Sequence, residues 1–179
     1  MRDYEAEYRY MLTDPKHSEI IEHLPTLRRY ASASLSVAEL GVHDGSTSFA
    51  MMMGRPRTLI AVDLVRHPEI DGVEEAARDL GVRYEFLLGD SRQVTLPFID
   101  MLFIDSFHSG NHLEAELNRH SGGVSRYILL HDTEIFGDVG EDGAPGLWSA
   151  ISAFLRNHNE WRLAWHHTNN HGLSCLVRT

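Results

Sequence analysis

The sequence predicts an α/β protein, a three-layer sandwich in which helices cover both faces of a seven-stranded, mostly parallel sheet with a C-terminal antiparallel hairpin. Two patterns support this fold class. Five apolar runs alternate with helix-like segments between residues 35 and 131, and such alternation is typical of parallel sheets. Two further apolar runs, 161–166 and 173–177, lie close enough along the chain to pair as a hairpin.

The boundaries of the elements follow from hydrophobic periodicity and from turn residues. Gly81 is placed to end one helix, and Ser46 or Thr47 to cap the start of an earlier one. In chain order we expect strand 35–40, helix 46–53, strand 58–63, helix 70–80, strand 84–89, strand 99–105, helix 111–120, strand 126–131, helix 147–157 and the hairpin.

Residues 1–34 are predicted to form an N-terminal helical cap, and residues 35–179 the main domain. Tyr4 and Tyr8 recur at helical spacing, as do Leu24 and Leu27 further along. Two prolines at positions 15 and 25 interrupt this segment. We expect the cap to belong to one globular unit, or to form half of a subunit contact in a homo-oligomer.

Composition limits the classes of protein to consider. With 179 residues, 42% of them apolar, the chain can bury one continuous core. A formal charge of −10 argues against nucleic-acid partners, which attract basic proteins. The single cysteine, Cys175, lies in an apolar run and is expected in the core, which fits a reducing compartment. The charged N-terminal residues and the absence of a long apolar stretch predict a cytoplasmic protein without a membrane partner, with export by another route left open.

Five acids end, or directly follow, the predicted parallel strands. Because ligands bind at the carboxyl ends of such strands, we expect these acids to converge there. A single Asp in this place is more often the N-cap of the next helix. Five carboxylates together repel one another unless a cationic ligand, a metal ion or both lie among them. The acids are Glu39, Asp63, Asp90, Asp105 and Asp132.

Residues 37–48 read as a strand, a glycine-containing turn and the start of a helix. Gly41 and Gly45 allow the backbone to pass close to a ligand. The spacing differs from the G-x-G-x-x-G pattern of dinucleotide sites, which argues against a pyrophosphate here.

This block resembles the first motif, E-x-G-x-x-x-G, of class I S-adenosylmethionine-dependent methyltransferases, which have a Rossmann-like fold. The resemblance implies that Asp63 binds the ribose hydroxyls of S-adenosylmethionine and that Asp90, with Ser91 beside it, lies at the adenine. A carboxylate suits the first role because its two oxygens accept from two vicinal hydroxyls. The full set implied for the cofactor is Glu39, Gly41, His43, Gly45, Ser46, Asp63, Asp90 and Ser91.

The later segments 99–108 and 127–133 resemble metal-dependent small-molecule O-methyltransferases related to cephalosporin hydroxylase proteins and to macrolide and rhamnosyl sugar O-methyltransferases. The resemblance spans about residues 18–178. It implies a divalent ion held by Asp105 and Asp132, with His131 where several relatives have an acid. Oxygen ligands favour Mg²⁺, our default expectation, whereas recruitment of His131 or His108 shifts the preference toward Mn²⁺, Fe²⁺ or Zn²⁺.

The expected reaction is methyl transfer to a hydroxyl of a small molecule, such as a sugar, a phenol or a natural product. Asp105 or His108 would remove the proton of the acceptor. His108 is equally compatible with a general base, a metal ligand or an exposed loop residue. Two alternatives stay open: a catalytically silent cofactor-binding partner or regulatory subunit and, well behind it, a nicotinamide-dependent oxidoreductase.

Three further segments carry expectations. The Gly- and acid-rich stretch 137–146 is predicted to be either a mobile lid or an ordinary surface loop. His112 and Glu116 are one helical turn apart and are predicted to lie on the surface. The C-terminal histidines are predicted to occupy strand and turn positions without an acidic partner: His166, His167 and His171.

Overall fold

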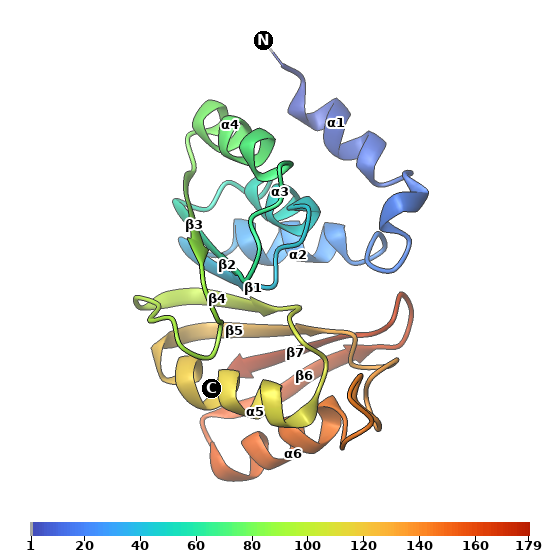
Figure 1. Ribbon diagram of the computed structural model, residues 1–179. Coiled ribbons are helices and arrows are strands. Elements are labelled where there is room, and N and C mark those ends of the chain that lie inside the picture. Colours follow the sequence, from blue (N-terminus) through green and yellow to red (C-terminus); the bar gives the residue numbers. More distant parts are fainter. Residues whose placement is uncertain (1) are drawn as a thin grey trace.

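The computed structural model describes residues 2–179 and contains one seven-stranded sheet in the order β3-β2-β1-β4-β5-β7-β6 (Figure 1). Strands β1 to β5 are parallel, and β7 runs antiparallel to both β5 and β6. The predicted fold class is confirmed. The strands are β1 (Ser36–Leu40), β2 (Thr58–Asp63), β3 (Arg83–Leu88), β4 (Ile99–Ile104), β5 (Val124–His131), β6 (Trp161–His167) and β7 (Leu173–Arg178).

Helices cover both faces of the sheet, and each face has its own apolar core. Figure 1 shows α1 to α4 on one side and α5 with α6 on the other. Side chains alternate along a strand, so Val37 packs on the α1–α4 side while Ala38 and Leu40 pack on the α5–α6 side. The helices are α1 (Tyr4–Met11), α2 (Leu24–Ser32), α3 (Ser46–Met52), α4 (Ile70–Leu80), α5 (Gly110–His120) and α6 (Leu147–Asn157), with 3₁₀ turns η1 (Pro15–His17) and η2 (Ser121–Gly123).

The N-terminal segment is part of the core on the α1–α4 side. Tyr8, Leu24 and Leu27 are buried in the same apolar cluster as α3 and α4. Pro15 and Pro25 lie in the first turns of η1 and α2, where a missing backbone N–H costs no hydrogen bond. The prolines therefore begin helices here, rather than interrupting one.

Two local expectations have different outcomes. Gly81 ends α4 in the left-handed conformation, with φ of 72°, as predicted. The predicted side-chain cap of α3 is wrong: its N-cap is Gly45, and no side chain makes the capping hydrogen bond.

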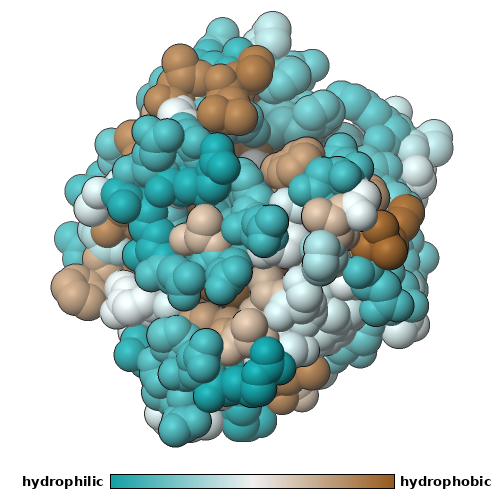
Figure 2. Space-filling view, turned by 60° about the horizontal axis from the view of Figure 1, so that its bottom comes forward, coloured by the Kyte–Doolittle hydropathy of each residue, from teal (hydrophilic) through white to brown (hydrophobic). Residues whose placement is uncertain are grey.

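The face shown in Figure 2 is largely hydrophilic, and hydrophobic residues gather there in small separate groups. Cys175 is buried, as expected. Within residues 2–179, each helix is too short or too polar to cross a membrane.

Candidate functional site

A cavity of about 570 Å³ opens at the edge of the sheet where the parallel strands end. Four of the five strand-end acids line it, from β2, the β3–β4 connection and the ends of β4 and β5. They are Asp63, Asp90, Asp105 and Asp132. The predicted convergence is correct for these four.

Glu39 is the exception, and the prediction that it faces the crevice is wrong. It lies inside β1 rather than at its end, is fully buried and points toward α3. Its two carboxylate oxygens accept hydrogen bonds from the hydroxyls of Thr47 and Ser48. Burial raises the pKa of Glu39 to about 8, although those hydroxyls act in the opposite direction. Glu39 thus fixes the first turn of α3 from behind the cavity.

The glycine loop, residues 41–45, forms one wall of the cavity. Gly41 has φ of +85°, and a Cβ added there would lie 1.9 Å from the backbone oxygen of Asp105. Only glycine permits this approach between the ends of β1 and β4. Gly45, with φ of +82°, lies behind the loop against Val73 of α4. Gly41, His43 and Ser46 all line the cavity. Gly45 does not line it, and its positive φ lets the loop turn into α3.

Asp63 is held by the glycine loop. Its Oδ2 accepts from the backbone N–H groups of Val42 (2.7 Å) and His43 (2.9 Å), and its Oδ1 accepts from Val65 N–H (3.0 Å). Burial works to raise the pKa of Asp63, but these N–H groups outweigh it and lower the pKa. The carboxylate therefore stays ionised. Oδ2 already accepts two hydrogen bonds, whereas Oδ1 accepts one and retains a lone pair for a hydroxyl donor in the cavity.

Asp90 and Ser91 lie at the far end of the cavity from the glycine loop. Arg92 binds both oxygens of Asp90, with Nε at 3.0 Å and Nη2 at 2.8 Å, and this side chain lowers the pKa of Asp90 to about 2. Ser91 Oγ lies 3.4 Å from Nε2 of His112, which also lines the cavity.

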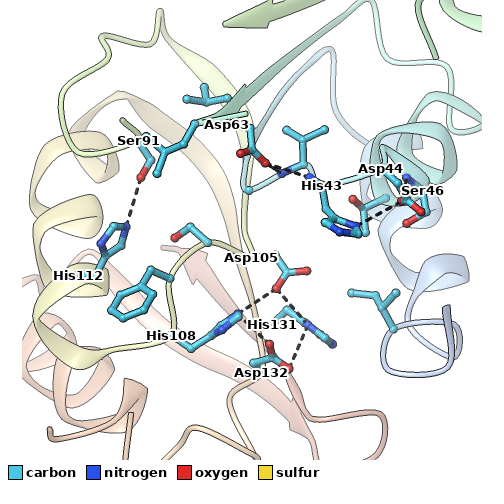
Figure 3. A pocket seen from close by; sticks show the side chains of 18 of the residues that line it. His43, Asp44, Ser46, Asp63, Ser91, Asp105, His108, His112, His131 and Asp132 are labelled. Carbon is cyan, nitrogen blue, oxygen red and sulfur yellow. Dashed lines mark hydrogen bonds and ion pairs between the residues drawn. The ribbon is translucent and has the colours of Figure 1, made fainter. Parts of the chain in front are cut away.

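The cluster of Asp105, His108, His131 and Asp132 lies across the cavity from Asp63 (Figure 3). His131 Nδ1 lies 3.2 Å from Asp105 Oδ1 and 3.4 Å from Asp132 Oδ1. Ligand atoms from Asp105, His131 and Asp132 all lie within 4.8 Å of one another. Two ligand atoms at right angles on one ion at about 2.1 Å are about 3 Å apart, so this spacing suits a shared cation.

The tautomer of His131 follows from its second nitrogen. Nε2 lies 3.1 Å from the backbone oxygen of Asn170, which can only accept, so Nε2 carries the proton. In the neutral ring Nδ1 then presents a lone pair to two carboxylates. Either a proton or a cation must separate these groups, because acceptors facing one another repel.

Asp132 shows the same need for a positive charge. Its side chain is buried, and Oδ1 accepts no hydrogen bond in the part of the chain described, although the Nδ1 atoms of His131 and His171 lie 3.4 and 3.3 Å from it. Its backbone φ is +57°, a conformation that non-glycine residues adopt rarely and that often marks functional sites. A buried carboxylate oxygen without a hydrogen bond is costly unless a positive charge, either a protonated imidazole or a metal ion, lies beside it.

His108 bridges the two carboxylates. Its Nε2 lies 2.8 Å from Asp132 Oδ2 and 3.4 Å from Asp105 Oδ1, and its ring stacks on Phe136 at 4.9 Å. Nδ1 faces Glu141 Oε2 at 3.2 Å. Burial works to lower the pKa of His108, but the two aspartates outweigh it and raise the pKa to about 10. His108 thus lies in the cavity, so the exposed-loop alternative is wrong.

The turn between β6 and β7 reaches the cluster, which the sequence did not predict. It supplies the Asn170 carbonyl and places His171 Nδ1 3.3 Å from Asp132 Oδ1. His166 Nε2 lies 3.1 Å from Glu134. The expectation that these two histidines lack acidic partners is therefore wrong, although their strand and turn positions are confirmed.

His112 and Glu116 are not a surface pair, contrary to prediction. Glu116 is fully buried; its Oε1 accepts from Ser106 Oγ at 2.7 Å and lies 3.2 Å from His112 Nε2. The sequence does indicate that Glu116 is buried, because it lies on the apolar stripe of α5 with Leu113 and Leu117.

Residues 137–146 form a loop with internal hydrogen bonds, including Gly140 N–H to Ala144 and Gly146 N–H to Asp138. The Glu141 backbone donates to His108, and its side chain lines the cavity. The loop therefore borders the cluster; motion as a lid stays a prediction.

No protein-family model matches the sequence, and a search of curated proteins finds no match either. Solved structures do share the fold. A Staphylococcus aureus protein assigned as a caffeoyl-CoA O-methyltransferase is 11% identical over 88% of this chain and 83% of its own, with a TM-score of 0.65. The magnesium protoporphyrin IX methyltransferase of Synechocystis PCC 6803, with bound S-adenosylmethionine, is 14% identical over 88% and 79%, with a TM-score of 0.62.

A third similar structure holds both a substrate and a spent cofactor. The 1,6-didemethyltoxoflavin-N1-methyltransferase of Burkholderia thailandensis contains 1,6-didemethyltoxoflavin and S-adenosylhomocysteine. It is 14% identical over 100% of this chain and 92% of its own, with a TM-score of 0.61. At these identities the likeness concerns the fold: the chain has the Rossmann-like sheet that these methyltransferases have.

Proposed function

We propose that this protein is an S-adenosylmethionine-dependent methyltransferase that uses a divalent metal ion to methylate a hydroxyl oxygen of a small molecule. One observation carries the proposal. A single cavity at the carboxyl edge of the sheet joins the glycine loop and Asp63 to the Asp105–His131–Asp132 group. The proposed cofactor site and the proposed cation site thus share one cavity, as group transfer between two bound reactants requires.

The cofactor side of the cavity suits an adenosine. Asp63 is an ionised acceptor, and its Oδ1 retains a lone pair for a ribose hydroxyl. The glycine loop exposes backbone beside it, and Asp90 with Ser91 closes the end where the resemblance puts the adenine. The likeness in fold to structures that hold S-adenosylmethionine or S-adenosylhomocysteine supports this choice of nucleoside.

The residues of the cluster fit a divalent ion. Asp132 Oδ1 is buried without a hydrogen bond, and Nδ1 of His131 in its neutral form directs a lone pair at two carboxylates. Asp105, His131 and Asp132 would hold the ion. The imidazole favours Mn²⁺ or Fe²⁺ over the Mg²⁺ predicted by default, because Mg²⁺ prefers an all-oxygen shell. When bound, the ion would coordinate the acceptor oxygen and lower its pKa.

His108 is the candidate base. The negative charges of Asp105 and Asp132 raise the pKa of His108, so its Nε2 keeps a proton. In this state Nε2 cannot accept a proton from a substrate. Positive charge beside those carboxylates weakens their hold on this proton. With a cation bound there, Nε2 of His108 would be able to accept the proton of an acceptor hydroxyl.

The test is isothermal titration of chelator-treated protein with S-adenosylhomocysteine, followed by Mg²⁺ and Mn²⁺ in separate runs. We expect cofactor binding without metal, then a separate metal event that is tighter for Mn²⁺. Turnover is then measured with sugar, catechol and macrolide hydroxyl acceptors. Absence of S-adenosylhomocysteine binding would refute the proposal. Binding of cofactor and metal with no acceptor turned over would favour a silent cofactor-binding subunit.

A further inference from the structure

The chain contains a single lysine, Lys16, and the fold places it on the wall of the cavity. It belongs to η1 in the N-terminal segment, far in sequence from the glycine loop that it meets. Of the lysine and arginine side chains in residues 2–179, only Lys16 and Arg92 line the cavity. Arg92 is engaged by Asp90 at the opposite end. Lys16 is therefore the one such cation beside the glycine loop.

Lys16 forms an ion pair with Asp44 of the glycine loop. Its Nζ lies 2.7 Å from Asp44 Oδ2, while Asp44 Oδ1 accepts from the backbone N–H of Ser46 at 3.2 Å. The Asp44 side chain is only 9% exposed, whereas that of Lys16 is 56% exposed. Burial works to raise the pKa of Asp44, but Lys16 and the Ser46 N–H outweigh it and lower the pKa. Both groups stay charged at neutral pH.

The place of this pair along the cavity is informative. Figure 3 shows Asp44 and Ser46 on the side opposite Ser91 and His112, with Asp63 between them. A nucleoside that lies with its base near Ser91 and its ribose on Asp63 directs its 5′ substituent toward the glycine loop. In S-adenosylmethionine that substituent ends in an amino acid, with one ammonium and one carboxylate group.

We propose that Lys16 and Asp44 bind the amino-acid end of the cofactor, Lys16 its carboxylate and Asp44 its ammonium group. The inference rests on the proposed function and adds the residues that select a zwitterionic nucleoside. The Lys16 end of the pair is 56% exposed and solvent screens it, so exchanging this pair for two pairs with the ligand costs little. Charge-assisted hydrogen bonds to the ligand in a partly closed cavity stabilise the complex by more than loss of the Lys16–Asp44 pair destabilises it. The N-terminal segment thereby becomes part of the binding site.

The decisive comparison uses two nucleosides. S-Adenosylhomocysteine has the amino-acid end, and 5′-methylthioadenosine has the same adenine, ribose and thioether sulfur without it. We expect wild-type protein to bind the first more tightly. Lys16→Met lowers the affinity for S-adenosylhomocysteine at least tenfold and changes that for 5′-methylthioadenosine less than twofold, whereas Lys16→Arg retains most of the preference.

A matched control separates binding from tethering of the N-terminal segment. Arg28 pairs with Glu5 at 2.6 Å and joins α2 to α1 away from the cavity, so Arg28→Met should leave both affinities unchanged. If Lys16→Met weakens both nucleosides equally, or neither, the inference is wrong and the cofactor assignment stands. If wild-type protein binds neither nucleoside, the proposed function fails as well.

A second measurement observes the lysine directly. Reductive methylation with ¹³C-formaldehyde labels Lys16 and the chain N-terminus only, and it keeps the positive charge. The Lys16 signal, identified by its loss in Lys16→Arg, should shift on addition of S-adenosylhomocysteine and stay in place with 5′-methylthioadenosine. Equal responses to the two nucleosides would overturn the assignment of Lys16.

Discussion

The two sides of the cavity stabilise their buried carboxylates in opposite ways. Asp63 is surrounded by donors, since three backbone N–H groups stabilise its charge. Asp105 and Asp132 share their surroundings with imidazoles, and Asp132 Oδ1 has no hydrogen-bond partner among residues 2–179. The first carboxylate is prepared for neutral hydroxyl donors, whereas the second pair requires a cation. Compensation of charge therefore distinguishes the proposed nucleoside side from the proposed metal side within one cavity.

The two sides meet at Gly41, and a substitution there should damage both. In Gly41→Ala the new Cβ would lie 1.9 Å from Asp105 O in a backbone with φ of +85°, so the ends of β1 and β4 must separate. We expect a loss of about 3 kcal/mol or more in the free energy of unfolding, from steric overlap and strain. Chemical denaturation measures it, and titration should show cofactor and metal binding lost together.

Gly122→Ala is the matched control, because nothing lies within 4 Å of the added Cβ and the residue is outside the cavity. It should retain stability and binding. Intact cofactor and metal binding in Gly41→Ala would mean that the two strand ends do not need this close approach.

Substitution of a single carboxylate should affect ligand binding on one side of the cavity and not on the other. Asp63→Asn removes charge-assisted hydrogen bonds to ribose and should weaken S-adenosylhomocysteine about ten- to a hundredfold while leaving Mn²⁺ affinity nearly unchanged. Asp105→Asn removes a metal ligand and should weaken Mn²⁺ about a hundredfold while changing nucleoside affinity about threefold or less. Titration calorimetry on both variants measures the four constants. A fall in both affinities in either variant would contradict the division.

The sequence predicted correctly that four of the five acids line the cavity, for a physical reason. Asp63, Asp105 and Asp132 end or follow strands, so the parallel sheet alone brings them to one edge. Glu39 was misplaced because it lies within β1, where side-chain alternation turns it toward α3. Position relative to the strand end, rather than residue type, decides which acids face the cavity.

The contribution of the β6–β7 turn could not be predicted. The residues around Asn170 form a pattern that indicates a turn and nothing more. Their contact with His131 depends on β7 pairing beside β5, a tertiary arrangement whose register local sequence does not encode. The absence of a hydrogen bond to Asp132 Oδ1 likewise depends on the tertiary arrangement of all the surrounding elements.

The turn offers a smaller test of the metal side. Gly172 has φ of +94°, and an added Cβ would lie 2.4 Å from the backbone nitrogen of Glu134. Gly172→Ala should displace the turn, release the His131 ring from the Asn170 carbonyl and weaken Mn²⁺ about tenfold. Electron paramagnetic resonance of free Mn²⁺ measures the change. S-Adenosylhomocysteine affinity serves as the internal control, and an equal loss there would indicate general unfolding instead.

The last test concerns Glu39, behind the cavity, and measures how stability changes with pH. The pKa of Glu39 is raised to about 8 in the folded protein, above its ordinary value near 4.5. Between these values the folded chain keeps a proton that the unfolded chain has released, so the contribution to stability is complete at low pH and is lost as pH rises toward 8. Relative to Glu39→Gln, wild-type protein should lose at most about 1.4 kcal/mol per pH unit in this window. Denaturant titrations at pH 5, 6, 7 and 8 measure the difference. A constant difference between the two proteins would mean that Glu39 is ionised throughout, and that Thr47 and Ser48 compensate its charge as fully as the backbone compensates Asp63.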